Sequence, residues 1–281
     1  MEARLQVDKQ DLELDLFLTA VYRLSGFDFR KYMKSSIMRR VENRLRLEGL
    51  KNISQLTEKV IHHDVFLQKV LDDFSINVTE MFRDPSFFLS FREKVIPLLR
   101  ELPEIRVWHA GCSSGEEAYS MAILLEEEGV GHKAKIYATD MNEKILEKAQ
   151  KGIIPLSKMK TYTKNYMQAG GKTAFSEYYH SDHEFAYINE DLLNRIIFAQ
   201  HNLVTDRSFN EFHIIVCRNV LIYFNLELQH NVIQLFQESL GAEGFLGLGS
   251  KEALRLDAHP GFEEFDLYDK LYRKKNGELG F

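Results

Sequence analysis

The first quarter of the chain shows apolar residues at helical spacing. A first helix is indicated by Leu12, Leu16, Phe17, Ala20, Val21 and Leu24, and Ser25-Gly26 ends it. A second helix is predicted from about Phe29 to Glu48, with Gly49 as its stop. Ser54 and Asp64 are expected to cap a third and a fourth helix. Residues 11–74 are therefore predicted to form a small all-helical N-terminal domain.

Beyond the join at Asp72–Thr79, short apolar runs alternate with amphipathic helical segments. Pro85 suits a helix start. Strands are expected near Val107, at 135–140, 196–202, 212–219 and 244–249, with helices starting at Glu116, spanning 143–151, and running from about 226 to 240 before Gly241. Such alternation predicts a mostly parallel sheet covered on both faces. A closing hairpin at 262–275 would add an antiparallel edge strand, so residues 75–281 are predicted to form an α/β domain.

The alternation breaks between Gly152 and Arg195. Some forty residues separate two core elements, and they carry short alternating runs rich in tyrosine and phenylalanine. An inserted subdomain, part β, at about 153–195 is the economical explanation.

Arg106–Tyr119, which we name the cofactor corner, is the chain's most informative stretch. It reads as a buried strand, a turn bracketed by Gly111 and Gly115, and a helix start, and this is the form of a nucleotide-cofactor site. Glu116 and Glu117 place negative charge where a phosphate would lie. This disfavours a nicotinamide dinucleotide and favours a cofactor with hydroxyls and a cation, such as S-adenosylmethionine. The alternative is that both acids are ordinary first-turn residues favoured by the helix dipole.

Polar residues at other strand ends are further candidates, because ligands of open α/β sheets bind there. Asp140 is placed to accept ribose hydroxyls, although it could simply cap the next helix. Arg218, Asn219 and Tyr223 are placed to face cofactor and substrate, although Tyr223 alone could be core. The amide of Asn202, in His201-Asn202-Leu203, suits an adenine edge.

Asn77–Pro85 lies at the join between the two predicted domains. Arg83, beside Asn77 and Thr79, could clamp a carboxylate, and an interdomain salt bridge or a cap is the alternative.

The net charge of −6 conceals a basic segment from Arg30 to Arg46. On a helical wheel Arg39 and Arg46 lie opposite the apolar face, and Arg40 and Arg44 line its edge. The asymmetry suggests an acidic partner, and a solvated face is the alternative.

Bulk features exclude several classes of protein. The 281 residues are 44% hydrophobic and 28% charged, without a long apolar run, a signal peptide or a nucleic-acid motif, so we expect no membrane insertion and no nucleic-acid partner. Cys112 and Cys217 are expected to be buried free thiols in a reducing compartment. His180 and His183 have no third ligand nearby, so no metal is expected.

Five motifs in order resemble the chemotaxis-receptor methyltransferase (CheR-type) family. They are Asn-x-Thr-x-x-Phe-Arg, Trp-x-Ala-x-Cys-Ser-x-Gly-Glu-Glu-x-Tyr-Ser, Ala-Thr-Asp, His-Asn-Leu and Cys-Arg-Asn-Val-Leu-Ile-Tyr-Phe, and the resemblance covers roughly residues 11–275. It implies a Rossmann-like class I methyltransferase domain with a small inserted β-subdomain, preceded by an all-helical domain. It also implies methyl transfer from S-adenosylmethionine, leaving S-adenosylhomocysteine, to glutamate side chains of methyl-accepting chemotaxis proteins.

The resemblance assigns residues one by one. Cofactor contacts would fall on Asn77, Thr79, Arg83, Gly111, Glu117, Asp140, Asn202, Leu203, Arg218 and Asn219. Tyr223 would lie beside the transferred methyl. Our own hypothesis is that Arg83 and Tyr223 clamp the substrate carboxylate, and that the basic segment with Arg39, Arg40, Arg44 and Arg46 docks an acidic receptor helix. Departures from the family pattern occur at Val78, Glu80, Met81 and Lys251, none of them at an assigned position.

The implied partners are the cytoplasmic helices of transmembrane chemoreceptors. A cytoplasmic monomer recruited to membrane receptor clusters follows as an expectation. Whether the insertion grips a receptor C-terminal peptide stays open. Two alternatives also remain: a non-catalytic adaptor that binds S-adenosylmethionine, and a methyltransferase of a different protein carboxylate.

Overall fold

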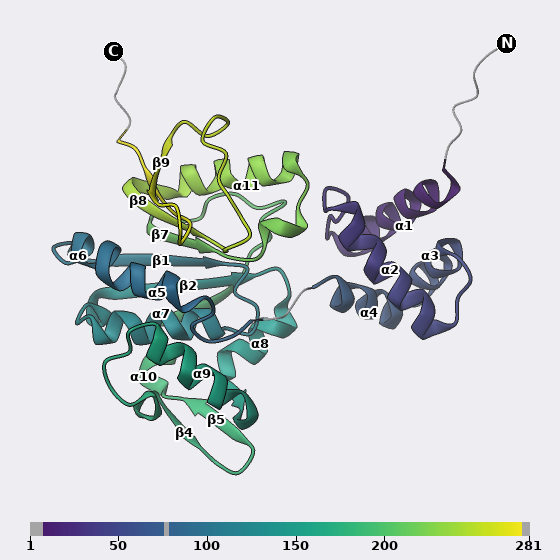
Figure 1. The fold of residues 1–281 in the computed structure, drawn as a ribbon. Coiled ribbons are helices and arrows are strands. Elements are labelled where there is room, and N and C mark those ends of the chain that lie inside the picture. Colours follow the sequence, from purple (N-terminus) through teal and green to yellow (C-terminus); the bar gives the residue numbers. More distant parts are fainter. Residues whose placement is uncertain (1–7, 76–78, 277–281) are drawn as a thin grey trace. The chain divides into compact units, whose positions relative to one another are not determined.

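A computed structural model describes residues 8–75 and 79–276 and divides the chain into two compact units (Figure 1). Unit 1 comprises Met1–Ile76 with Tyr223–Gln229, and unit 2 comprises Asn77–Ile222 with His230–Phe281.

Unit 1 contains the four expected helices, α1 (Lys9–Ser25), α2 (Lys34–Glu48), α3 (Ile53–His62) and α4 (Asp64–Phe74). Gly26 and Gly49 end the first two in the left-handed conformation, as their positions predict. Two details of the prediction are wrong. Helix α2 begins at Lys34 rather than near Phe29, and the cap of α3 is Asn52, whose side chain accepts from the Gln55 amide, rather than Ser54.

The core of unit 1 is aromatic. Phe74 packs edge-on against Phe17 and Phe29, with ring centroids 6.2 and 4.9 Å away. Arg44 joins α2 to α4 through a two-pronged ion pair with Asp73, at 2.6 and 2.8 Å. The unit therefore combines an apolar centre with a charged tie at its edge.

Unit 2 is built on a seven-stranded sheet in the order β6-β2-β1-β7-β8-β10-β9. The strands are β1 (Ile105–Ala110), β2 (Ala134–Asp140), β6 (Ile196–Gln200), β7 (Phe212–Cys217), β8 (Leu240–Leu248), β9 (Phe262–Asp266) and β10 (Leu271–Lys274). The first five of this order pair in parallel, and β10 pairs antiparallel with both β8 and β9. The predicted mostly parallel sheet with an antiparallel edge is confirmed.

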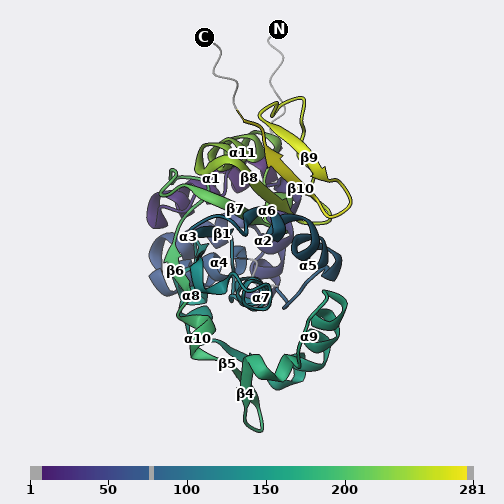
Figure 2. The same ribbon diagram turned by 90° about the vertical axis from the view of Figure 1, so that its left-hand side faces the viewer.

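Helices cover both faces of this sheet (Figure 2). On one face lie α5 (Pro85–Ser90), α7 (Glu116–Glu127) and α8 (Glu143–Lys151). On the other, α11 (Leu226–Ser239) packs Phe236 edge-on against Trp108 of β1, with ring centroids 5.4 Å apart. Helix α11 runs directly into β8 at Leu240, so Gly241 lies within a strand and is not the helix stop that was expected. A π-helical turn (Phe91–Val95) and α6 (Ile96–Leu99) continue the chain beyond α5.

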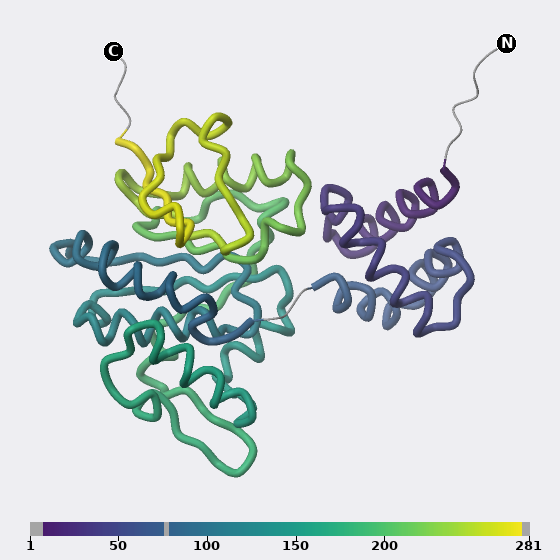
Figure 3. Tube along the Cα trace, viewed as in Figure 1, coloured from purple at the N-terminus to yellow at the C-terminus, as the bar shows by residue number. Residues whose placement is uncertain are grey.

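The inserted subdomain lies between α8 and β6 in the chain, and its path can be followed in the trace of Figure 3. It contains β3 (Ile153–Pro155), α9 (Leu156–Gln168), a 3-10 turn (Phe175–Tyr178), β4 (Tyr179–Ser181), β5 (Phe185–Ile188) and α10 (Glu190–Leu193). The three strands form a separate sheet in the order β3-β5-β4. The predicted part-β character of the insertion is thus confirmed.

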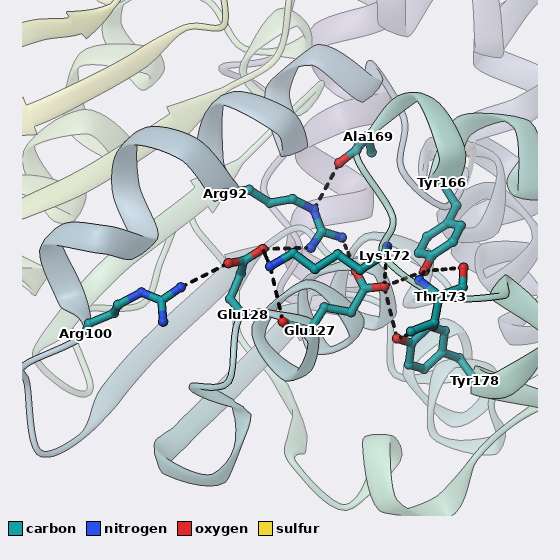
Figure 4. Close-up of polar contacts among 9 residues, drawn as sticks. All are labelled: Arg92, Arg100, Glu127, Glu128, Tyr166, Ala169, Lys172, Thr173 and Tyr178. Atoms are coloured by element: carbon teal, nitrogen blue, oxygen red, sulfur yellow. Dashed lines mark hydrogen bonds and ion pairs between the residues drawn. The ribbon is translucent and has the colours of Figure 1, made fainter.

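Two buried acids at the end of α7 fix the insertion to the main sheet (Figure 4). Glu127 accepts hydrogen bonds from Arg92, from the hydroxyls of Tyr166 and Tyr178, and from the Lys172 amide at 2.9 Å. Burial opposes ionisation of Glu127, but these donors and the Arg92 charge outweigh it and lower its pKa. Acids at a helix C-terminus oppose the dipole, so these two carboxylates depend on the cationic and hydroxyl donors around them.

Neighbouring Glu128 completes the cluster. It pairs with Arg92 at 3.1 Å, Arg100 at 3.2 Å and Lys172 at 2.8 Å, while the Arg92 Nε donates to the Ala169 carbonyl at 3.0 Å. The single helix α7 therefore carries the cofactor corner at its start and the anchor of the insertion at its end.

We predict that Glu127→Ala lowers the free energy of unfolding of unit 2 by about 3 kcal/mol, because it leaves Arg92 buried without one partner. Glu126→Ala is the matched control: its neighbouring carboxylate is 45% exposed and pairs with Arg195, so a loss below about 1 kcal/mol is expected. Urea unfolding of the full chain measures both. Equal losses for the two variants would show that the buried cluster does not stabilise the fold.

Candidate functional site

The turn of the cofactor corner is tight and needs glycine. Gly111 and Gly115 have φ values of 78° and 91°, in the left-handed region. A Cβ on Gly111 would lie 2.6 Å from Val220 Cγ2, too close for any other residue without a shift. The turn therefore holds the end of β1 against the segment that follows β7.

The backbone amides of this turn are already hydrogen-bonded. Those of Gly111 and Cys112 both donate to the Thr139 carbonyl at 2.8 Å, and that of Ser113 donates to Asp140 Oδ2 at 2.9 Å. A phosphate-binding turn presents such amides to its ligand. This geometry disfavours a pyrophosphate-bearing dinucleotide on grounds independent of the acidic helix start.

Asp140, the predicted ribose acceptor, ends β2 beside the turn. Its second oxygen accepts from the backbone amide of Asn142 at 3.0 Å. The cap of α8 is Asn142 itself, whose side chain accepts from the Lys144 amide, so the alternative that Asp140 caps this helix is wrong. Burial raises the pKa of Asp140, although the hydrogen bonds from Asn142 and Ser113 counteract part of this effect. A carboxylate offers about four lone-pair sites, so these two contacts are compatible with the predicted ribose role.

Arg218 is the most connected residue of the site, and it is buried, with 1% of its side chain exposed. Its guanidinium donates to Glu117 Oε2 at 2.6 Å, to Asp84 Oδ2 at 2.6 Å and to the Arg83 carbonyl at 3.0 Å. It also lies 4.3 Å from the centre of the Phe87 ring. Arg218 therefore joins the end of β7, the start of α7 and the Arg83 segment.

The two acids of the helix start differ in their surroundings. Glu116 accepts from Ser114 Oγ at 2.6 Å and pairs with Lys158 of the insertion at 3.6 Å. Glu117 lies between Arg218 and His109, and 15% of its side chain is exposed. Burial opposes its ionisation, yet the Arg218 charge and the His109 contact give it a lowered pKa. Glu117 is thus a fixed carboxylate with an open edge, which suits a cationic group.

Backbone strain concentrates in the same three segments. Among the described residues other than glycine, positive φ occurs at Phe82, Asp84, Ser113, Asn219, Glu243 and Lys270. Of these, Phe82 and Asp84 flank Arg83, Ser113 lies in the turn of the cofactor corner, and Asn219 follows Arg218. Left-handed non-glycine residues cost energy and cluster at binding sites, so this is an independent sign of function. Ser113 Oγ is also buried and has no hydrogen-bond partner within residues 8–75 and 79–276.

Asn219 and Asn202 are each held by hydrogen bonds within the protein. The backbone amide of Asn219 donates to Glu252 Oε2 at 2.9 Å, and the same oxygen accepts from the backbone amide of Gly249 at 2.6 Å. Asn202 Oδ1 accepts from the Val204 amide at 3.0 Å, and Leu203 lies in that turn, half-buried. Sequence reasoning missed Glu252 and His109, although His109 lies within the cofactor corner and Glu252 follows Lys251, because their roles depend on contacts that only the fold supplies.

The contacts described above do not include Asn77, Thr79 or Tyr223. Asn77 lies outside the described residues, and Thr79 is half-buried shortly before the strained Phe82. Tyr223 belongs to unit 1, where its carbonyl accepts from the Met33 amide at 2.7 Å and its ring lies 5.7 Å from the Arg40 guanidinium. The assigned roles of Thr79 and Tyr223 stay predictions.

The predicted docking arginines follow the helical wheel of α2. Arg39 and Arg46 are exposed, whereas Arg40 and Arg44 are half-buried and bonded to Asp73. A hollow of about 570 Å³ in unit 1, the basic hollow, is lined by Arg39, Arg40, Glu42, Asn43, Arg46 and Asp73. Arg44 does not line the hollow, and its guanidinium forms ion pairs with Asp73 and Glu48.

The described residues give little support to thiol chemistry, metal binding or membrane insertion. Both cysteines are free and buried, and burial raises the pKa of each thiol, which makes them inert. Within residues 8–75 and 79–276, no group of three or more metal-ligating side chains could hold an ion. None of the helices in those ranges is long and apolar enough to cross a membrane.

Comparison with known proteins agrees with the site. Residues 77–268 match the family model "CheR methyltransferase, SAM binding domain", and residues 12–75 match "CheR methyltransferase, all-alpha domain". A protein of Pseudomonas putida named "Putative methyltransferase Cher3" is 44% identical over 94% of this chain and 97% of its own. A "Chemotaxis protein methyltransferase" of Listeria monocytogenes is 32% identical over 87% of this chain and 92% of its own.

Solved structures are more distant. A SAM-dependent methyltransferase of Geobacter sulfurreducens, crystallised with S-adenosylhomocysteine, is 15% identical with a TM-score of 0.34, and the match covers 60% of this chain and 49% of that one. The two family models together cover most of the chain. The chain belongs to the CheR methyltransferase family and binds S-adenosylmethionine through unit 2.

Proposed function

We propose that this protein methylates glutamate side-chain carboxylates of chemoreceptors to glutamyl methyl esters, with S-adenosylmethionine as the donor. The observation that carries the proposal is the Glu117–Arg218–Asp84 arrangement: it holds a partly open carboxylate at a helix start and fixes the Arg83 segment beside it. Relatives named chemotaxis protein methyltransferase in Listeria and Salmonella support the choice of substrate.

The chemistry suits a site without a general base. A glutamate carboxylate has an unperturbed pKa of about 4.3 and is ionised at neutral pH, so no proton has to be removed. The bound donor supplies an activated methyl group on its sulfonium. Glu117 is held by Arg218 and His109, and Asp140 is held by two backbone amides. Both carboxylates are therefore suited to binding the donor and not to removing a proton. Rate enhancement would come from alignment and exclusion of water.

Each residue then has a distinct role. Glu117 would accept the donor's amino group, and Asp140 its ribose hydroxyls. Arg83 would hold the substrate carboxylate through its guanidinium, with its main chain fixed by Arg218 at 3.0 Å. Tyr223 would lie beside the transferred methyl, as the family resemblance implies. Asn77, Thr79, Asn202, Leu203 and Asn219 would complete the cofactor contacts.

Substrate recognition would fall to the basic hollow of unit 1. Two of its arginines, Arg39 and Arg46, are exposed at one face of α2. The cytoplasmic helices of chemoreceptors present glutamates to their methyltransferases, so opposite charges would steer the encounter. A monomer acting on membrane receptor clusters from the cytoplasm follows from this proposal.

We predict that the full chain transfers labelled methyl from S-adenosylmethionine to receptor-containing membranes as base-labile esters. Arg83→Ala is expected to lower kcat/KM on a receptor fragment by roughly 100-fold or more, because the carboxylate loses its cation. Arg255→Ala is the control, since its 64% exposed side chain pairs with the equally exposed Asp257 and activity should be unchanged. Label release on mild alkali and steady-state rates measure both.

The outcomes separate the alternatives. Binding of S-adenosylhomocysteine without any transfer indicates an adaptor and refutes the proposal. Ester formation confined to proteins other than receptors indicates a different carboxylate substrate. An Arg83→Ala enzyme with wild-type kcat/KM removes Arg83 from the clamp.

For the basic hollow, we predict that reversing Arg39, Arg40 and Arg46 to Glu weakens receptor-fragment binding about tenfold at low salt, because attraction becomes repulsion. The difference should shrink as salt rises from about 0.05 to about 0.5 M, since screening removes it. Reversing the exposed Lys9, Lys51 and Lys69 changes the charge of unit 1 equally outside the hollow and is the control. Titration of a labelled fragment measures both, and equal effects of the two triple variants would rule out docking at the hollow.

A further inference from the structure

His109 is a buried residue of the cofactor corner that the proposed mechanism does not use. It lies near the end of β1, in register with Ala138 of β2 and Val216 of β7, and is 1% exposed. Neighbours on both sides fix its backbone. Its Nδ1 lies 3.4 Å from Glu117 Oε1, and its Nε2 has no partner among the described residues.

The unpartnered nitrogen needs an explanation. A buried polar atom without a hydrogen bond is destabilising, and an apolar side chain of similar shape would avoid that cost. Cores therefore retain such a group where its other end does something that an apolar residue cannot. In His109 the other end is the Nδ1 that faces Glu117.

Glu117 needs two donors to be fixed in orientation. The terminal torsion of a glutamate is broad and roughly two-fold, so one contact leaves the carboxylate plane loosely defined. Arg218 anchors Oε2 at 2.6 Å, and His109 faces Oε1. Two anchors on different oxygens fix the plane and aim the remaining lone pairs at the 15% of the side chain that is open.

We propose that His109 is a positioning residue for methyl-donor binding, which orients Glu117 toward the donor's amino group. The inference rests on the proposed role of Glu117. It gives His109 a specific signature: its loss affects ligands that carry the amino-acid part of the donor and spares ligands that lack it. Because this contact is remote from the reacting methyl, KM for the donor should rise while kcat at saturation stays unchanged.

Two variants test the idea in the full chain. His109→Asn places an amide nitrogen where Nδ1 lies and keeps the donor, whereas His109→Leu removes it together with the unpartnered Nε2. Calorimetric titration uses S-adenosylhomocysteine, which carries the amino acid, and 5′-deoxy-5′-methylthioadenosine, which does not. We expect His109→Leu to weaken S-adenosylhomocysteine about tenfold and the second ligand less than about threefold, with His109→Asn near wild type for both.

A double variant tests whether His109 acts through Glu117. His109→Leu added to Glu117→Gln should cost nothing further in S-adenosylhomocysteine affinity if His109 acts through Glu117. Equal weakening of both ligands by His109→Leu, or no weakening of either, overturns the inference. If wild type transfers methyl while Glu117→Gln binds S-adenosylhomocysteine normally, the inference fails and the proposed function stands. If wild type binds neither ligand, both fail.

Discussion

The buried guanidinium of Arg218 organises the proposed methyl-donor site. It satisfies two carboxylates and a main-chain carbonyl from segments far apart in the sequence, and it lies against Phe87. A buried cation of this kind is tolerated only when its hydrogen bonds are well formed. The three segments that meet there also contain Phe82, Asp84, Ser113 and Asn219 in left-handed conformations, so the strain of the site and its main tie lie together.

Helix α7 extends this organisation across unit 2. Its first turn holds Glu117, the proposed donor contact, and its last turn holds Glu127, to which the insertion is anchored by two tyrosines and a backbone amide. The insertion also returns to the Arg83 segment, since Asn165 donates to the Met81 carbonyl at 3.1 Å. One rigid element thus positions both the cofactor corner and the subdomain beside it.

Much of this could be predicted from the sequence, because local signals were strong. Alternating apolar runs predicted the sheet, Gly111 and Gly115 predicted the tight turn, and the position of Asp140 predicted a strand-end carboxylate. The N-cap at Asn52 and the late start of α2 were missed because several polar residues compete for such positions within a few residues.

Features that depend on tertiary contacts could not be predicted. The sequence indicated that Arg218 lies at a strand end of the site, but not that it bonds Asp84 and Glu117, because these partners lie 134 and 101 residues away. The same holds for His109, Glu252 and the Glu127 cluster, whose roles come from what packs against them. A charged residue that interrupts an apolar strand end signals a site, but only the fold shows whether it touches the ligand or its holder.

The most direct test is calorimetric titration of S-adenosylhomocysteine into Arg218→Lys. Lysine keeps the charge but lacks the planar fork, so it cannot serve Glu117, Asp84 and the Arg83 carbonyl together. If Arg218 organises the site, binding should weaken at least roughly tenfold although the variant is folded. An affinity equal to that of wild type would contradict the account, because charge alone would then suffice.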